Sequence, residues 1–353
     1  MILQATAAEY LVVGAGPAGL TAACLLALKG RKVVVADPGA PLAKRLELLP
    51  PSSLRTVAAV GLESLLHDPA IARPCLGIRR QRIASQYDYE DFFSHPYRTG
   101  YVINRTRFDE RLRRRAAAAG VAFCRLRVTG IEPNGHCLRV RPSSGPPEVL
   151  PFAGTIIDAT GRAAMIARRQ GARVSVRDRL VAELIEETFN DSAADTASWL
   201  DYRSDGAGWS YRISGPAGHA QQWRVSRPGK VAGKSRYRVD ASSSCLSEAA
   251  GQNWIAVGDA AIAFDPIASQ GLFNALSSAL VASGILMSAE GLNIVSARLY
   301  SDIVAATFTY SEFNRLKVYQ TDWPAVVGEP DAGLANGAAL VAAAGRHQAG
   351  DRH

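Results

Sequence analysis

The sequence predicts an α/β fold, and three observations support this prediction. A glycine-rich turn joins a short apolar strand to an Ala/Leu-rich helix near the amino terminus. A second strand, ending in an acid, follows that helix directly. Two further strand-and-turn segments lie far downstream, at 155–162 and 253–261. Strands that alternate with a helix in this way are typical of a parallel sheet.

Length and composition limit the classes of protein to which the chain can belong. The chain has 353 residues, 48% of them hydrophobic and 20% charged, which fits two domains or one domain with a large insertion. These values exclude collagen-like, coiled-coil and wholly disordered classes. The longest apolar stretch, 272–287, is interrupted by polar residues and falls short of the roughly 20 residues of a membrane span. We expect a cytoplasmic protein, because the first strand begins near Tyr10 and leaves no room for a cleaved signal peptide.

The first predicted unit is a strand, a turn, a helix and a second strand. Residues 9–13 form the first strand, which runs directly into Gly14-Ala15-Gly16-Pro17-Ala18-Gly19. Residues 20–29 are Ala/Leu-rich and predict a helix that Gly30 terminates. Residues 31–36 predict the second strand, and Asp37 ends it. This is the GxGxxG pattern in the structural context that gives it meaning.

Each position of the turn has a physical reason. Gly14 permits the tight turn, Gly16 lets backbone N–H groups approach a pyrophosphate, and Gly19 allows the helix to pack closely on the strand. The helix amino terminus then faces the negative charge. Asp37 lies where a carboxylate accepts hydrogen bonds from ribose hydroxyls. The unit therefore predicts dinucleotide binding, although it does not by itself separate FAD from NAD.

The distant segments add a resemblance to a known family. Residues 155–162 form a strand and a turn, and residues 253–261 form a strand that ends in Gly258-Asp259. Phe264-Asp265-Pro266 and Ser269-Gln270-Gly271 follow. Over roughly residues 8–295 the chain resembles the class A flavin monooxygenase and flavin-dependent halogenase superfamily, which is built on the glutathione-reductase-type FAD-binding fold.

The resemblance implies FAD as the cofactor and assigns its contacts. Asp259 would contact the ribityl or pyrophosphate part. The loop of Pro266, Ser269, Gln270 and Gly271 would place N–H groups and a helix start beneath the flavin N1–C2=O edge, where reduced flavin carries negative charge. Arg105, in a stretch where an Arg precedes a Phe-Asp pair, would lie near FAD, with a salt bridge as the alternative. Val128 would lie on the strand whose backbone meets the adenine.

The resemblance also divides the chain. We expect a discontinuous, Rossmann-like FAD-binding domain at 8–60, 99–165 and 245–295, and a substrate domain at 61–98 and 166–244. Residues 296–353 would be a helical segment with a flexible tail. Alternation in Trp209-Ser210-Tyr211-Arg212-Ile213 predicts antiparallel strands in the substrate domain. Few residues separate Tyr211 from Cys245, so we expect a reduced antiparallel sheet and an open pocket.

A lysine-dependent halogenase is disfavoured by two departures from the family pattern. Such enzymes carry a Trp-x-Trp-x-Ile-Pro signature, whereas residues 209–214 read Trp-Ser-Tyr-Arg-Ile-Ser. The expected lysine is missing, because the basic residues within 79–86 are all arginines. Arginine does not replace it, since a pKa above about 12 prevents the required amine chemistry.

The favoured function is an aromatic monooxygenase, similar to the lysine-lacking flavoproteins that help form quinone cofactors. FAD reduced by NAD(P)H or another reductant would react with O2 to a C4a-hydroperoxide that hydroxylates an aromatic small molecule or a residue of a partner protein. The alternatives are a flavin-dependent reductase of C=C bonds and a non-catalytic FAD-binding maturation protein.

Three residues are candidates for the reaction site. Glu47 is either a carboxylate near the flavin or a structural residue. Trp209 and Tyr211 alternate by two and so share one strand face. They line either the site or an inter-domain core. His95 and His219 are weaker candidates for a base.

Other partners are not indicated. The formal charge of +8 suits an anionic cofactor, but no nucleic-acid motif accompanies it. The basic run Arg111–Arg115 is expected to be a solvated helix face. The five cysteines form no ligand spacing, so we expect no metal site. Oligomeric state is not determined by the sequence.

Overall fold

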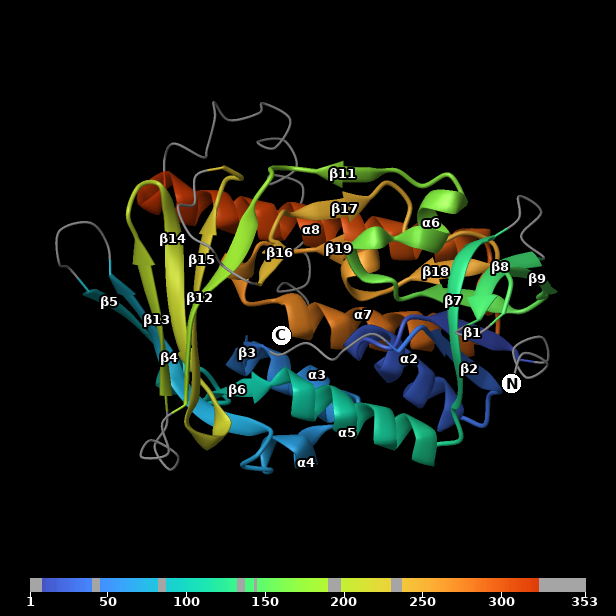
Figure 1. Ribbon diagram of the computed structural model, residues 1–353, viewed down its shortest axis with the longest axis horizontal. Coiled ribbons are helices and arrows are strands. Elements are labelled where there is room, and N and C mark those ends of the chain that lie inside the picture. The colour runs from blue at the N-terminus through green and yellow to red at the C-terminus, as the bar shows by residue number, and fades with distance from the viewer. Residues whose placement is uncertain are drawn as a thin grey trace, which may run out of the picture.

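A computed structural model of the chain describes residues 8–39, 45–81, 87–131, 137–142, 145–189, 198–229 and 237–323 (Figure 1). Two large sheets stand at opposite ends of the molecule in this view, and helices lie between and along them (Figure 1). The α/β fold predicted from the sequence is confirmed.

The first sheet has seven strands and contains the predicted strand–turn–helix unit. Its order is β18 (Trp254–Ala256), β10 (Thr155–Asp158), β1 (Tyr10–Val13), β2 (Val33–Asp37), β7 (Ala122–Ile131), β8 (Cys137–Pro142) and β9 (Glu148–Pro151). Val12 of β1 pairs in parallel with Ile157 on one side and Val35 on the other. The central strands are apolar because both faces of a parallel sheet are covered. Their carboxyl ends meet at one edge, where α/β sheets bind ligands.

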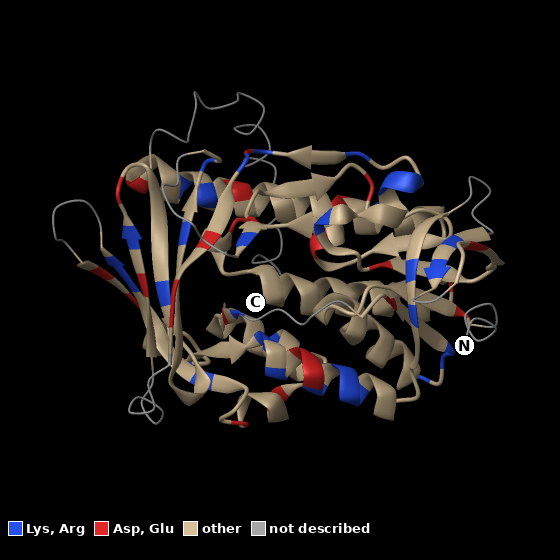
Figure 2. Cartoon of the chain, in the orientation of Figure 1, with Lys and Arg blue, Asp and Glu red and all other residues tan. Residues whose placement is uncertain are grey.

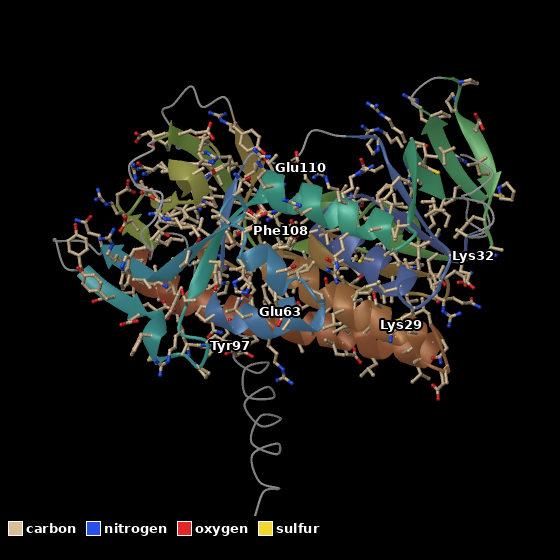
Figure 3. The ribbon with its side chains drawn as sticks, turned by 90° about the horizontal axis from the view of Figure 1, so that it is seen from below. Lys29, Lys32, Glu63, Tyr97, Phe108 and Glu110 are labelled. Atoms are coloured by element: carbon tan, nitrogen blue, oxygen red, sulfur yellow. The ribbon has the colours of Figure 1, made fainter. Side chains whose placement is uncertain are left out.

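Helices lie beside this sheet and between the two large sheets (Figure 1). They are α2 (Pro17–Ala27), α3 (Leu54–Ala59), α4 (Glu63–Leu66), α5 (Arg105–Ala118), α6 (Met165–Arg169) and α7 (Gly271–Met287). Pro17 begins α2 at a position where its missing N–H costs nothing. Asn104 caps α5 by accepting from the Arg107 N–H at 3.2 Å. Seen from below, α5 lies beside α2, with Phe108 buried and Lys29 at the far end of the α2 unit (Figure 3).

The second sheet has nine strands. Its order is β16 (Arg238–Asp240), β12 (Val181–Phe189), β15 (His219–Ser226), β14 (Gly208–Ser214), β13 (Ser198–Ser204), β4 (Ala72–Gln81), β6 (Gly100–Asn104) and β3 (Leu46–Leu49), with β5 (Tyr87–Asp91) paired to β4. Its strand pairs are antiparallel, as the sequence predicted, apart from one. β13 pairs with β4 in parallel, which joins the early and late strands into one sheet.

Strands from several of the predicted ranges contribute to the nine-stranded sheet. β3 and β6 lie inside ranges assigned to the FAD-binding domain, yet they pair with each other, and β6 pairs with β4, in the nine-stranded sheet. A small third sheet of β11 (Val174–Val176), β17 (Ser244–Leu246) and β19 (Ile262–Ala263) lies between the two. Short 3-10 helices occupy several connections, including η3 (Gly161–Ala163), η6 (Gly258–Ala260) and η7 (Pro266–Ala268).

The predicted carboxyl-terminal helix is α8 (Ile294–Asp322). Asn293 and Ser296 begin it with reciprocal side-chain-to-backbone hydrogen bonds, which satisfy otherwise unpaired amide groups. The flexible tail predicted after this helix falls on 324–353, outside the described residues.

The charged residues are spread over several helices and strands of the described chain (Figure 2). Acidic and basic residues both occur along α5 and on the strands of the nine-stranded sheet (Figure 2). The arginines at 111, 113, 114 and 115 are exposed, as expected for a solvated helix face. Four of the five free cysteines are buried and Cys137 is half-buried. Across the described ranges, no helix combines the length and the apolar character that a membrane crossing requires.

Candidate active site

The glycine turn between β1 and α2 has the geometry of a phosphate cradle. Gly14 has φ +110°, and a Cβ there would lie 2.3 Å from the Ala159 carbonyl oxygen. At Gly19 a Cβ would lie 2.2 Å from the Gly14 oxygen, so helix and strand approach as closely as predicted. A Cβ at Gly16 would meet no atom within 4 Å, which leaves space in front of the α2 amino terminus. The turn thus keeps its own backbone close and an open face toward a ligand.

Asp37 lies at the end of β2, beside this turn. Its Oδ2 accepts from the Ala15 N–H at 3.0 Å, and its Oδ1 accepts from the Gly39 N–H at 2.7 Å. These bonds fix the carboxylate at the carboxyl edge of the sheet, where a ribose would lie. Val128 lies on β7, two strands from β1, with its side chain buried in the core, so only its backbone is available to a ligand.

A second loop meets the glycine turn from the other side. β18 leads into Gly258 and Asp259, and a Cβ at Gly258 would lie 2.7 Å from the Ala18 Cβ. The Asp259 side chain keeps 37% of its surface exposed and lies 3.9 Å from Arg162 Nε. Arg162 donates to the carbonyls of Ser242 and Phe264. The predicted pyrophosphate and ribityl residues are therefore neighbours of one another, which fits FAD.

The loop before α7 has the form predicted for the flavin edge. Asp265 caps η7 by accepting from the Ile267 N–H at 3.0 Å, and Ser269 adopts φ +48°. The chain then turns directly into α7 at Gly271, where a Cβ would meet no atom within 4 Å. The amino terminus of a 17-residue helix therefore faces open space, and its partial positive charge suits an anionic flavin edge.

One cavity of about 140 Å³ connects these residues with the nine-stranded sheet. On the flavin side it is lined by Asp259, Asp265, Pro266, Ser269, Gln270 and Gly271. On the sheet side it is lined by Ile78, Leu200, Tyr202, Trp209, Tyr211 and Trp223. The charged residues that line it are Arg45, Glu47, Arg80, Arg162, Asp240, Asp259 and Asp265. Residues as far apart in the sequence as Arg45 and Gly271 thus line the same cavity.

The sheet side of the cavity is an aromatic wall. Trp209 and Tyr211 share a face of β14, as predicted, with ring centroids 5.7 Å apart. Tyr202 of β13 lies opposite Tyr211, with its ring 5.6 Å from that of Trp209. Burial and the nearby Glu47 carboxylate raise the pKa of the Tyr211 phenol, so it stays a neutral donor. The wall offers apolar, stackable surface for a planar substrate.

Glu47 lines the cavity and is held by two arginines. Its Oε1 lies 2.5 Å from Arg105 Nη1 and 2.5 Å from Arg45 Nε. Burial alone would raise the pKa of this carboxyl, but the two guanidinium groups lower it below the ordinary value. Arg105 is 4% exposed and also forms a two-pronged pair with Asp109, at 3.1 and 3.0 Å. Arg105 therefore lies behind Glu47, and Glu47 and Arg45 are the members of this group that line the cavity.

The histidine candidates lie elsewhere. His95 stacks on Tyr97, and its Nδ1 accepts from the Tyr97 N–H at 3.2 Å. His219 lies 2.7 Å from Glu187 at the start of β15. Neither side chain lines the cavity. Among the described residues, no group of three His, Cys, Asp or Glu side chains is arranged to hold a metal ion.

Several cavity residues were missed from the sequence. Arg45, Arg80, Arg162, Tyr202 and Trp223 line the site without belonging to any motif. Arg162 is the exception, because it is the last residue of the segment 155–162 that the sequence identified as a strand and a turn. The others reach the cavity through strand pairing, which no local pattern announces.

Comparison with known proteins agrees with this geometry. Residues 7–135 match the FAD binding domain family. The flavin-dependent halogenase armH5 of Armillaria mellea is 26% identical over 365 residues, covering 84% of this chain and 68% of that protein. A triple mutant of the flavin-dependent brominase Bmp2 superposes with a TM-score of 0.74 at 15% identity, over 89% of both chains. The peptidyl tryptophan dihydroxylase QhpG superposes with a TM-score of 0.67 at 23% identity, over 92% of this chain and 80% of that one.

The cradle and the comparisons define the class of protein. The chain contains an FAD-binding domain and has the fold of the flavin monooxygenase and halogenase superfamily. It is an FAD-dependent oxidoreductase. The resemblance recognised in the sequence is confirmed at this level.

Replacing Asp259 by Ala is expected to weaken FAD retention. The side chain is the exposed carboxylate of the second loop, beside Arg162, so its loss removes an acceptor and little packing. Removing a hydrogen bond to a ligand typically weakens binding by about tenfold. The measurement is bound flavin per folded chain after gel filtration, and unchanged flavin content would contradict the assignment. Asp240→Ala, which removes an exposed acid of the same cavity, is the control.

Proposed function

We propose that this protein is a monooxygenase that hydroxylates an aromatic substrate and draws electrons from NAD(P)H or another reductant. One observation supports this best: the aromatic wall of Tyr202, Trp209, Tyr211 and Trp223 faces the flavin-side loop across a single cavity. A planar substrate stacked on that wall would lie between protein rings and the cofactor edge. We also propose a cytoplasmic location, where reduced pyridine nucleotides are supplied.

The reaction balances as follows. The aromatic C–H, O2, NAD(P)H and one proton become the phenolic C–OH, NAD(P)+ and water. Bound FAD supplies the redox chemistry that passes the electron pair to oxygen. The chain supplies binding, orientation and exclusion of water.

The residues divide this work. The α7 amino terminus at Gly271 and the loop from Pro266 would stabilise negative charge on a bound flavin. Trp209 and Tyr211 orient the substrate ring, and Ile78 and Leu200 exclude water beside them. Glu47 is kept ionised by Arg105 and Arg45, so it accepts hydrogen bonds rather than donating them.

Two observations favour hydroxylation over halogenation. The basic side chains that line the cavity in the described part of the chain are arginines, at 45, 80 and 162. A guanidinium stays protonated and lacks the amine chemistry that halogenation requires by resemblance. The dihydroxylase relative is described as acting on a peptidyl tryptophan, so a residue of a partner protein is the favoured form of the substrate.

An exposed strand offers a place for such a partner. β5 lies at the edge of the nine-stranded sheet beside β4, and Tyr87 and Tyr89 are 49% and 63% exposed. Phe93, just beyond β5, is 65% exposed. Exposed aromatic residues on a strand at the edge of a sheet are a common feature of peptide-binding surfaces.

The proposed function is tested by following the transfer of oxygen from ¹⁸O2 gas to an aromatic substrate. The purified FAD-loaded protein is reduced with NADH or NADPH and mixed with ¹⁸O2, aromatic or tryptophan-containing peptide substrates, and bromide. We expect a product carrying one ¹⁸O per hydroxylation and no brominated product. Brominated product would identify a halogenase. Substrate reduction without O2 uptake would identify a C=C reductase, and stable FAD that is neither reduced nor reoxidised in this assay would identify a non-catalytic protein.

A further inference from the structure

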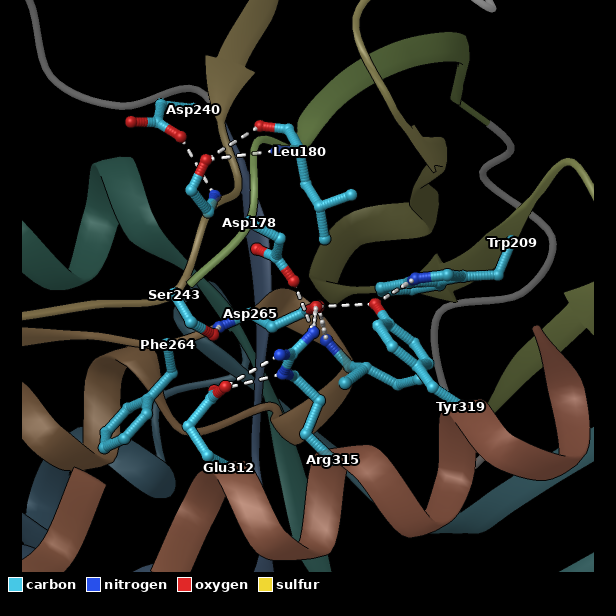
Figure 4. Close-up of polar contacts among 12 residues, drawn as sticks. Asp178, Leu180, Trp209, Asp240, Ser243, Phe264, Asp265, Glu312, Arg315 and Tyr319 are labelled. Carbon is cyan, nitrogen blue, oxygen red and sulfur yellow. Dashed lines mark hydrogen bonds and ion pairs between the residues drawn. The ribbon is translucent and has the colours of Figure 1, made fainter. Parts of the chain in front are cut away.

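The helix α8 reaches the cavity wall through one tyrosine. Tyr319 is fully buried, and its hydroxyl donates to Asp265 Oδ2 at 2.5 Å and accepts from Trp209 Nε1 at 2.9 Å (Figure 4). Trp209 is 2% exposed and Asp265 is 1% exposed. One hydroxyl therefore joins three segments that lie far apart in the sequence.

Both partners of this hydroxyl line the cavity. Trp209 belongs to the aromatic wall on β14, and Asp265 begins the flavin-side loop by capping η7. The Asp265 Oδ1 accepts from the Ile267 N–H at 3.0 Å, so its two oxygens bond in different directions. Because a buried hydroxyl with both partners in place has one favoured orientation, Tyr319 sets the distance between the wall and the loop.

Asp265 belongs to a group of three carboxylates that share one arginine. Arg315, one turn before Tyr319, donates twice to Glu312 and once to Asp178, at 3.0, 2.7 and 2.5 Å (Figure 4). It lies 3.8 Å from Asp265, so one guanidinium serves three carboxylates. Burial, with a smaller contribution from the Asp178 carboxylate, raises the pKa of Asp265 to about 7, against the lowering effects of the Ile267 N–H, the Tyr319 hydroxyl and Arg315.

The remaining charged groups near this site are few. Arg162 donates to the carbonyl of Phe264, the residue before Asp265. Asp259 and Glu47 line the same cavity. Asp265 is therefore a group of the cavity that changes charge near neutral pH, and it is the direct partner of Tyr319.

We propose that Tyr319 is a positioning residue of the active site, through which α8 fixes the Trp209 indole against the flavin-side loop in a manner that depends on the protonation of Asp265. When Asp265 is ionised it only accepts, so the Tyr319 O–H points at it and the tyrosine oxygen accepts from Trp209. When Asp265 is protonated it becomes a donor and competes with Trp209 for the tyrosine oxygen. The proposal relies on the proposed function only in treating Trp209 as the substrate wall.

The test is Tyr319→Phe in the full FAD-loaded chain, followed by the ¹H–¹⁵N signals of the five tryptophan indoles. The variant keeps the ring and removes the hydroxyl. We expect the Trp209 indole proton, assigned with Trp209→Phe, to move upfield while the other four signals stay in place. In the unmodified protein the same signal should titrate with a midpoint near pH 7, and in Tyr319→Phe this midpoint should be lost.

Tyr300→Phe is the matched control. Tyr300 is also buried on α8, and its hydroxyl donates to the Ala256 carbonyl at 2.7 Å, away from the cavity. This variant should leave the Trp209 signal and its midpoint unchanged. An unchanged Trp209 signal in Tyr319→Phe, or the same change in Tyr300→Phe, would overturn the proposal.

A second variant covers the case in which Tyr319→Phe does not fold. Asp265→Asn keeps the tyrosine and removes the ionisable group, so the Trp209 midpoint near pH 7 should vanish, and its persistence would overturn the proposal. If the protein hydroxylates an aromatic substrate, Tyr319→Phe should also raise KM about three- to tenfold, as for one lost hydrogen bond. The indole signals need no substrate, so a failure of the proposed function leaves this test intact.

Discussion

Arg105→Ala is expected to destabilise the protein by about 3–5 kcal/mol, because it leaves the buried Asp109 carboxylate without its partner. Arg105 is 4% exposed and donates twice to Asp109 and once to Glu47. Asp109 is itself 4% exposed and has no access to water in compensation. The measurement is the free energy of unfolding from urea titration, with bound flavin recorded on the same samples.

The loss should depend on pH in a defined direction. Burial raises the pKa of Asp109 above its ordinary value, against the opposing effect of Arg105, so removing Arg105 raises it further. The folded variant then binds a proton that the unfolded chain releases, and its stability falls as pH rises through this interval. Arg105→Ala should therefore cost less near pH 5 than near pH 8.

Arg111→Ala supplies the comparison on the same helix. Arg111 pairs with Asp68 at 3.3 Å, but its side chain is 53% exposed, and such surface pairs contribute about 0–1 kcal/mol. Equal losses of unfolding free energy in the two variants would mean that the buried pairs of Arg105 stabilise the fold no more than a surface pair does. A loss of flavin from folded Arg105→Ala would show that Arg105 positions Glu47 for the cofactor as well as stabilising the fold.

What the sequence predicted well depends on local chemistry. The strand, turn and helix around Gly14 follow from steric rules that act within a few residues, and the structure has each element close to its expected bounds. The alternation that placed Trp209 and Tyr211 on one face is equally local, and both line the cavity. Segment 265–271 was recognisable through its resemblance to the family pattern, and in the structure Asp265 caps η7 and Gly271 begins α7.

The features that the sequence did not predict depend on contacts between residues that lie far apart in the chain. The nine-stranded sheet forms because Leu200 on β13 meets Ile78 on β4, and no period or turn signal in either strand specifies the other. Tyr319 lies 54 residues from Asp265, on a helix whose pattern predicts only a helix. The ion pair of Arg105 with Glu47 spans 58 residues and likewise follows from the fold rather than from a motif.

Gly14→Ala is the substitution expected to remove cofactor binding most completely. Its φ of +110° is a conformation that L side chains rarely adopt, at a cost of about 1–3 kcal/mol. The new Cβ would also lie 2.3 Å from the Ala159 oxygen and 2.9 Å from the Ala159 carbonyl carbon, both backbone atoms that no rotamer change moves away. The turn must then shift against β10, which adds an overpacking cost of about 1–3 kcal/mol.

Gly30→Ala separates the two contributions. Gly30 also has positive φ, at +78°, but a Cβ there would meet no atom within 4 Å. It should lose only the conformational part, about 1–2 kcal/mol, and keep its flavin. Gly14→Ala should retain less than about a tenth of the flavin per folded chain, since the displaced turn no longer presents its N–H groups to the pyrophosphate. Flavin content in Gly14→Ala equal to that in Gly30→Ala would show that the α2 turn is not the phosphate cradle.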